Sequence, residues 1–220
     1  GDVHGNASAL KRLLDALGYT QRGGVWQHDR RKAIFVGDLI DRGPGQIETL
    51  EIVRTMVGAE KARIVMGNHE FNAIGWVTPD PRDTTDYLRK RQGDKGPQHL
   101  HQHQAFLEAV EKKGVHDDWI AWFRGLPLWI EASGFRVVHA CWSDFHAAIF
   151  KDKGAVDDAA ILKPGAFERC HTDEELHEAT ETMLKGIEIP LPPPGGFYDS
   201  SRHWRTDIRV QWWNPAISTY

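Results

Sequence analysis

Residues 33–43 read AIFVGDLIDRG, a short apolar run that passes at once into glycine, aspartate and arginine. The run at 33–36 follows charged residues and ends at Gly37, which is typical of a strand buried on both faces. A helix is predicted to begin near Gln46, where apolar residues recur at helical spacing. A second buried strand is predicted over residues 64–66. This order of strand, helix and strand indicates an α/β fold built on a parallel sheet with crossover helices.

The elements on either side follow from the same kinds of pattern. Asn6 is a favourable N-cap and Gly18 a favourable helix stop, so a helix is predicted between them. Residues 76–104 are rich in proline, aspartate, arginine, glutamine and histidine, and we interpret them as a surface insertion. Further helices are predicted over residues 104–112, 117–123 and 173–185, and further strands over 128–131, 135–139 and 208–213.

Length and composition describe one globular domain over residues 1–220. Of the residues, 40% are hydrophobic and 26% are charged, which excludes a disordered tail, a fibre and a disulfide scaffold. No apolar run approaches the roughly 18 residues that a transmembrane helix needs. The net charge of −4 does not favour electrostatic binding to the phosphate backbone of a nucleic acid. With two cysteines and no signal segment, the chain is predicted to be cytoplasmic, with both thiols reduced.

Three polar clusters flanked by glycine stand at the start of the chain or directly after an apolar run. They read GDVHG at residues 1–5, GDLIDRG at 37–43 and GNHE at 67–70. In an open α/β sheet, ligands bind beyond the carboxyl ends of the strands, where the second and third clusters fall. Taken singly, each cluster has an ordinary explanation as a turn or as a surface histidine. Their succession at strand ends, with a further histidine after another predicted strand, favours a functional site instead.

The residue types in these clusters are those of metal ligands. Asp2 and His4 are two residues apart, so in extended backbone their side chains project on the same side. Asp38 offers a carboxylate whose oxygens could bridge two cations, Asn68 a neutral amide oxygen, and His139 a further imidazole. A mixture of nitrogen and oxygen donors without thiolate suits Mn²⁺, Fe, Zn²⁺, Co²⁺ or Ni²⁺. It suits neither a sulfur cluster nor a calcium site made only of oxygen ligands.

Together, the motifs GDVHG, GDLIDRG and GNHE resemble the signature blocks of the calcineurin-like metallophosphoesterases. The arginine and glycine that end the second block, and the glutamate of the third, are similar to the phosphoprotein phosphatase branch. That branch includes protein Ser/Thr phosphatases and bacterial diadenosine tetraphosphate hydrolases. The chain also resembles the phosphatase module of bacterial polynucleotide kinase-phosphatases. The resemblance covers residues 1–70 densely and extends to residues 137–140.

This resemblance implies a four-layer α/β/β/α sandwich that holds two divalent metal ions, with Mn²⁺ as the expected metal. By position in the motifs, Asp2 and His4 would bind the first ion, and Asp38 would bridge both. Asn68 and His139 would bind the second.

Three catalytic roles are implied by the same resemblance. Arg42 would contact phosphate oxygens, His69 would be the general acid, and Asp41 would orient His69. These roles agree with physical chemistry, because the guanidinium fork donates two parallel hydrogen bonds to a phosphate. A neighbouring carboxylate favours the protonated form of an imidazole and fixes its orientation.

Two departures from the family pattern are present. The family has a hydrophobic strand ahead of the Asp-x-His block, and no such strand precedes Asp2. It also has a late histidine ligand within a Gly-His segment, and this chain contains no Gly-His pair. The nearest candidate, His203, is more typical of a turn. We therefore expect a fragment of a longer protein, in which the first strand and the late ligand lie outside residues 1–220.

The sequence predicts a di-metal phosphoesterase that hydrolyses a phosphate ester or phosphoanhydride with metal-bound hydroxide. The substrate could be a phosphoprotein, a dinucleoside polyphosphate or a nucleic-acid end. Residues 76–104 and 196–215 are expected to line the substrate cleft. The alternative from another class is a catalytically incomplete binding or regulatory module of the same fold, which the absent late histidine favours.

Two weaker patterns remain. Residues 202–213 interleave arginines with tryptophans, as a platform for single-stranded nucleic acid would, although such tryptophans are more typical of packing. The alternating residues His99, His101 and His103 could bind a metal, but we interpret them as solvated members of the insertion.

Overall fold

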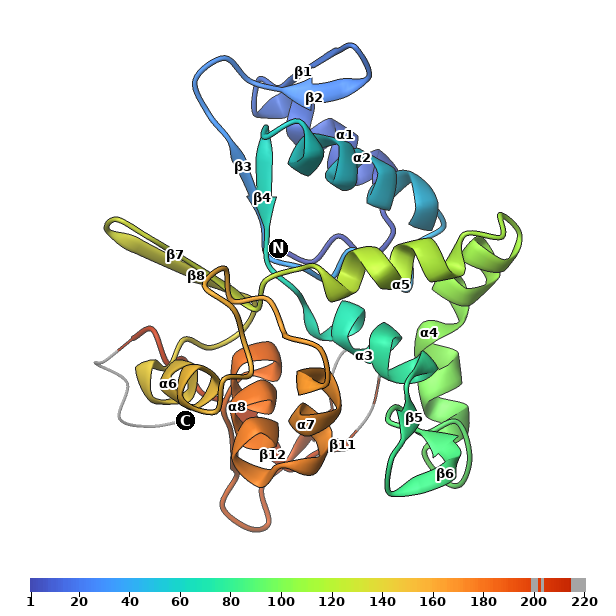
Figure 1. Ribbon diagram of the computed structural model, residues 1–220, viewed down its shortest axis with the longest axis vertical. Coiled ribbons are helices and arrows are strands. Elements are labelled where there is room, and N and C mark those ends of the chain that lie inside the picture. The colour runs from blue at the N-terminus through green and yellow to red at the C-terminus, as the bar shows by residue number, and fades with distance from the viewer. Residues whose placement is uncertain (199–201, 203, 215–220) are drawn as a thin grey trace.

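A computed structural model gives the arrangement of the chain (Figure 1) and describes residues 1–198, 202 and 204–214. The helices are α1 (Ala7–Ala16), α2 (Gln46–Gly58), α3 (Asn68–Val77), α4 (Gly96–Glu111), α5 (His116–Arg124), α6 (Asp144–Asp152), α7 (Ala166–Thr172) and α8 (Glu174–Lys185). The first strands are β1 (Thr20–Arg22), β2 (Val25–Gln27), β3 (Ala33–Phe35), β4 (Ala62–Ile64), β5 (Pro79–Asp80) and β6 (Asp83–Tyr87). The later strands are β7 (Trp129–Ala132), β8 (Phe135–Val138), β9 (Glu188–Pro190), β10 (Phe197–Tyr198), β11 (Trp204–Arg205) and β12 (Asp207–Arg209).

Strands β3 and β4 form the predicted parallel pair, with α2 as the crossover between them, but β4 ends at Ile64, where the predicted strand over 64–66 begins. Ala33 pairs with Ala62, and Phe35 with Ile64. One face of α2 is fully buried, because its apolar residues recur at helical spacing. Helix α1 packs alongside α2 (Figure 1). Both strands therefore end at the same edge, where the second and third polar clusters begin.

A second pairing brings a distant part of the chain to that edge. Strands β7 and β8 form the predicted antiparallel hairpin, with Trp129 opposite Val138. The turn holds Gly134 at φ 88°, which glycine adopts without steric cost. The backbone N–H of Met66 donates to the carbonyl of Pro127 at 2.7 Å, which ties the chain after β4 to the chain before β7. This link places the residue after β8, His139, near the ends of β3 and β4.

The segment 76–104 has its own secondary structure rather than being an irregular loop. It contains the end of α3, the β5–β6 hairpin and the first half of α4. Helix α4 begins at Gly96, well before the predicted start at Gln104, with Pro97 in its first turn. The buried carboxylate of Asp80 accepts from Arg82 at 2.9 Å and from Lys90 at 3.1 Å, which fixes the hairpin. The segment as an insertion remains a prediction.

Helices α6 and α7 both pack against α8 and form a second group, which lies below β3 and β4 in the view of Figure 1. Ser143 caps α6 through the N–H of His146, and Asp173 caps α8 through that of Leu176. None of the described helices combines the length and the apolar character needed to cross a bilayer. The α/β class is confirmed. Among the described residues the strands form six two-stranded pairs, and the four-layer sandwich remains a prediction.

Candidate metal centre

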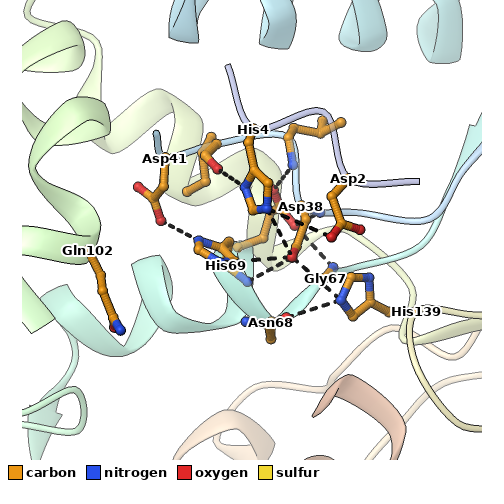
Figure 2. A network of polar contacts seen from close by, with 12 residues as sticks. Asp2, His4, Asp38, Asp41, Gly67, Asn68, His69, Gln102 and His139 are labelled. Atoms are coloured by element: carbon orange, nitrogen blue, oxygen red, sulfur yellow. Dashed lines mark hydrogen bonds and ion pairs between the residues drawn. The ribbon is translucent and has the colours of Figure 1, made fainter. Parts of the chain in front are cut away.

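The carboxylate of Asp38 is the point on which the predicted ligands converge (Figure 2). Its Oδ2 lies 3.6 Å from Nε2 of His139 and 3.9 Å from Nε2 of both His4 and His69. Asp2 joins the same group, with its Oδ2 3.8 Å from Nε2 of His4. These separations are too long for hydrogen bonds and are compatible with ligands of shared cations. The site therefore brings together side chains from the chain start, the ends of β3 and β4, and the end of β8.

His4 is held so that one ring nitrogen is left for a ligand. Its Nδ1–H donates to the carbonyl oxygen of Ile40 at 2.9 Å. Its Nε2 is buried and has no hydrogen-bond partner in the part of the chain that the structure describes. Burial lowers the pKa of His4, and the charges of His69 and Arg42 lower it further against the effect of Ile40. A neutral imidazole whose free lone pair points at two carboxylates fits a metal ligand.

The same logic applies to His139, with a second acceptor facing it. Its Nδ1 lies 2.5 Å from the carbonyl oxygen of Val36, and a ring with its one hydrogen on Nδ1 offers a lone pair at Nε2. That Nε2 lies 3.0 Å from Oδ1 of Asn68, which is also an acceptor. Two lone pairs that face each other beside the Asp38 carboxylate repel unless a proton or a cation lies between them. This donor set fits a divalent cation such as those named from the sequence.

The backbone at the site adopts conformations that side chains rarely take. His4, Asp38, Asp41 and Arg42 have φ values of 47°, 52°, 70° and 69°. They are four of the seven non-glycine residues with positive φ among those the structure describes. Each such residue costs about 1–3 kcal/mol, and such strain is found most often where function requires a particular geometry.

Close backbone packing explains the glycine before Asn68. A Cβ built on Gly67 would lie 2.3 Å from Oδ1 of Asp38 and 2.4 Å from its backbone nitrogen. Any side chain at Gly67 would therefore displace the central carboxylate. Gly67 thus has a steric function at this edge of the sheet.

Glu70 supports Asp38 from beneath. Its Oε2 accepts from the N–H groups of Asp38 at 2.8 Å and Gly67 at 3.0 Å, and its Oε1 accepts from Leu39 at 2.8 Å. The side chain is completely buried. A carboxylate is well suited to accept three backbone N–H groups, and this one fixes the strained turn that presents Asp38.

We expect Glu70→Gln to lower the free energy of unfolding by about 1–3 kcal/mol, because the new NH₂ group would face a backbone N–H donor. Chemical denaturation measures this loss, and calorimetric titration with Mn²⁺ should show weaker binding as the turn relaxes. Glu111→Gln, an exposed substitution at the end of α4, is the matched control. Unchanged stability and unchanged Mn²⁺ affinity in Glu70→Gln would contradict this role.

Asp41 and His69 form a close pair beside the ligands. Nδ1–H of His69 donates to Oδ2 of Asp41 at 2.5 Å, and the backbone N–H of His69 donates to Oδ1 of Asp38 at 3.0 Å. Burial opposes protonation of His69, but the hydrogen bond to Asp41 and the charges of nearby carboxylates outweigh it and raise the pKa of His69. Burial likewise tends to raise the pKa of Asp41, yet hydrogen bonds from His103 and His69 lower it. The pair therefore favours a carboxylate beside a protonated imidazole.

The other predicted residues are placed as follows. Arg42 is exposed, and its charge reaches His4. The prediction that the three alternating histidines are solvated is wrong for His103. Its side chain is buried and lies next to the carboxylate of Asp41. His203 lies outside the described residues. In the tail, Nε1–H of Trp212 donates to the carbonyl of Ala140 at 2.7 Å, so part of the tail lies next to the end of β8.

Comparison with known proteins identifies the family of this chain. A family model described as calcineurin-like phosphoesterase matches residues 1–167. The chain is 41% identical over 129 residues to bis(5'-nucleosyl)-tetraphosphatase PrpE, asymmetrical, of Bacillus subtilis strain 168, which covers 58% of this chain and 49% of that protein. It is 47% identical over 70 residues to the protein of the same name from Halalkalibacterium halodurans, covering 31% of this chain and 28% of that one.

A third relative has a related name. The chain is 32% identical over 143 residues to bis(5'-nucleosyl)-tetraphosphatase, symmetrical, of Aromatoleum aromaticum, which covers 64% of this chain and 42% of that protein. In all three alignments the chain spans less than half the length of the relative. The family resemblance seen in the motifs is confirmed by these matches. The chain belongs to the calcineurin-like phosphoesterase family, a family of hydrolases that bind divalent metal ions.

Proposed function

We propose that this chain hydrolyses a phosphate ester or phosphoanhydride with the help of two divalent metal ions, of which Mn²⁺ is the expected species. The observation that carries the proposal is the set of acceptor atoms around Oδ2 of Asp38. Nε2 of His4 has no hydrogen-bond partner among the described residues and faces the carboxylates of Asp2 and Asp38. Nε2 of His139 faces Oδ1 of Asn68 beside the same Asp38 carboxylate. Cations relieve the repulsion between such acceptor atoms, and oxygen and imidazole ligands in this mixture suit Mn²⁺ or its first-row neighbours.

The assignment of ligands follows the sequence motifs. By the motifs, Asp2 and His4 would hold one ion, Asn68 and His139 the other, and Asp38 both. The distances between ligand atoms group them differently, with His4 and Asp38 beside His69, and Asp2 and Asp38 beside His139. Nε2 of His69 is as near to Asp38 as that of His4, and we assign this nitrogen to proton donation rather than to an ion. When bound, two such ions supply Lewis-acid stabilisation of the phosphoryl group and activation of water.

The remaining steps belong to side chains of this chain. Protonated His69 would donate a proton from Nε2 to the departing oxygen, while its Nδ1–H stays bonded to Asp41. Arg42, exposed beside this pair, would hold non-bridging phosphate oxygens with its two parallel N–H groups. Glu70 and Gly67 would keep the Asp38 carboxylate in place throughout.

A dinucleoside polyphosphate is the substrate class that we favour. The three relatives described above are named bis(5'-nucleosyl)-tetraphosphatases. The family model that matches residues 1–167 covers all three motif blocks. A phosphoprotein and a nucleic-acid end are the other candidates from the sequence. The net charge of −4 gives the nucleic-acid end no additional support.

A catalytically incomplete module of the same fold is the alternative. It predicts that a ligand is missing or points away, yet Asp2, His4, Asp38, Asn68 and His139 are gathered at one place. We therefore favour the enzyme. Both cysteines are free and buried, in keeping with the predicted cytoplasmic location, which remains a proposal.

The test is a hydrolysis panel with and without added Mn²⁺. We expect Mn²⁺-dependent release of phosphate from para-nitrophenyl phosphate, and cleavage of diadenosine tetraphosphate with a higher kcat/KM than that of a phosphopeptide or a 3′-phosphorylated oligonucleotide. Mn²⁺ binding without turnover of any member of the panel would favour the incomplete module. Turnover that chelation with EDTA leaves unchanged would contradict the use of metal.

A further inference from the structure

His103 is the second hydrogen-bond partner of Asp41. Its Nδ1 lies 3.0 Å from Oδ1 of Asp41, while Oδ2 of the same carboxylate is bonded to His69. Asp41 is 2% exposed and His103 is 5% exposed, so both are shielded from water. The carboxylate thus lies between two imidazoles that come from α3 and from α4, 34 residues apart along the chain (103 − 69).

The surroundings of His103 decide which nitrogen carries the hydrogen. Its ring packs against Trp76 and Phe106, with centroid distances of 5.9 and 5.1 Å. Its Nε2 is buried and has no hydrogen-bond partner among the described residues. A hydrogen on Nε2 would be a buried donor without an acceptor, which is costly, whereas a hydrogen on Nδ1 meets a carboxylate oxygen. The ring therefore fits the neutral tautomer with its hydrogen on Nδ1.

The Asp41 carboxylate needs this partner to keep a single orientation. Its backbone is fixed by φ 70° and by donation of its N–H to Oε1 of Gln46 at 2.8 Å. Rotation about the last side-chain bond is still free in principle, because the two oxygens are chemically equivalent and this torsion is soft. A donor on Oδ1 satisfies one oxygen and leaves Oδ2 aimed at His69.

We propose that His103 is a positioning residue, which holds Asp41 so that the carboxylate in turn orients His69 toward the leaving group. The inference rests on the proposed function, because it takes His69 as the general acid. It extends that function to α4, whose first half belongs to the segment 76–104 that we expected only to line the cleft. His103 touches neither substrate nor metal and acts through Asp41 alone.

Two substitutions separate positioning from packing. In His103→Asn the side-chain amide nitrogen stands where Nδ1 stood and can still donate to Asp41, whereas His103→Leu fills the space without a donor. His101→Asn, an exposed substitution on the same helix, is the control. Each full-length variant is labelled with ¹⁵N-histidine, and the side-chain ¹H–¹⁵N signals of His69 and His103 are recorded.

The first readout does not depend on activity. We expect His103 of the unmodified protein to be the Nδ1–H tautomer, and the Nδ1–H signal of His69 to be retained in His103→Asn and His101→Asn. In His103→Leu the Nδ1–H signal of His69 should shift, or be lost because the hydrogen exchanges faster with water. An Nε2–H tautomer at His103, or an unchanged His69 signal in His103→Leu, would show that the proposal is wrong, whether or not the protein is active.

The second readout uses two esters that differ in the basicity of the leaving group. His103→Leu should lower kcat for phenyl phosphate by about tenfold, which is a fraction of what a general acid contributes. The same substitution should lower kcat for para-nitrophenyl phosphate much less. His103→Asn should stay within about threefold of the unmodified protein, with KM unchanged in both. Equal losses on both esters would indicate a merely structural residue. If the unmodified protein turns over neither these esters nor diadenosine tetraphosphate, the proposed function fails, and the tautomer and His69 signals still decide the role of His103.

Discussion

Asp38→Asn is expected to reduce Mn²⁺-dependent hydrolysis of para-nitrophenyl phosphate by more than about 100-fold, since loss even of groups that only orient ligands costs about 10–100-fold. Asparagine can keep the hydrogen bond from the backbone N–H of His69, so the local fold should persist. It cannot offer a second anionic oxygen toward His4 and His139. Initial rates and calorimetric titration with Mn²⁺ measure the two consequences.

The control for this variant is Asp152→Asn, which removes an exposed carboxylate at the end of α6. Its rate and Mn²⁺ affinity should equal those of the unmodified protein. Equal rates in Asp38→Asn and the unmodified protein, with both folded by circular dichroism, would rule out Asp38 as the shared ligand.

His69→Gln is expected to have the second largest effect, and its size should depend on the leaving group. A general acid contributes about 10²–10⁴-fold, so kcat for phenyl phosphate should fall within that range. The loss should be much smaller for para-nitrophenyl phosphate, whose leaving group departs readily without a proton. Steady-state rates for the two esters measure the contrast.

His28→Gln serves as the control, because this histidine contacts Tyr19 and Arg31 rather than a proposed ligand. We expect its ratio of rates on the two esters to match that of the unmodified protein. An equal loss of kcat on both esters in His69→Gln would rule out His69 as the general acid. It would instead favour His69 as a metal ligand beside His4, whose ring is adjacent to that of His69.

Much of the framework follows from local sequence patterns. The apolar runs that become β3 and β4 are short, continuous and bounded by glycine, and the helix between them makes a parallel pair nearly obligatory. The β7–β8 hairpin follows from the Ser133-Gly134 turn between two β-type runs. Because the ends of parallel strands share one edge, their polar clusters had to meet, and residue types then indicated a metal.

The residues that support the site were harder to predict. Glu70 stands in a motif, but its three hydrogen bonds depend on the approach of two backbone segments that local patterns do not specify. His103 looked like one of three solvated histidines, although it shares a helical face with the buried residues Phe106 and Val110. That spacing was the available signal, and the early start of α4 at Gly96 would have extended the face to include it.

The central claim is that two divalent ions share the carboxylate of Asp38, and anomalous X-ray scattering from crystals of the protein soaked in Mn²⁺ tests it most directly. We predict two manganese peaks on either side of that carboxylate, one touching Asp2 and His4 and the other touching Asn68 and His139. Manganese bound elsewhere, or no peak within bonding distance of Asp38 at saturating Mn²⁺, would contradict the account.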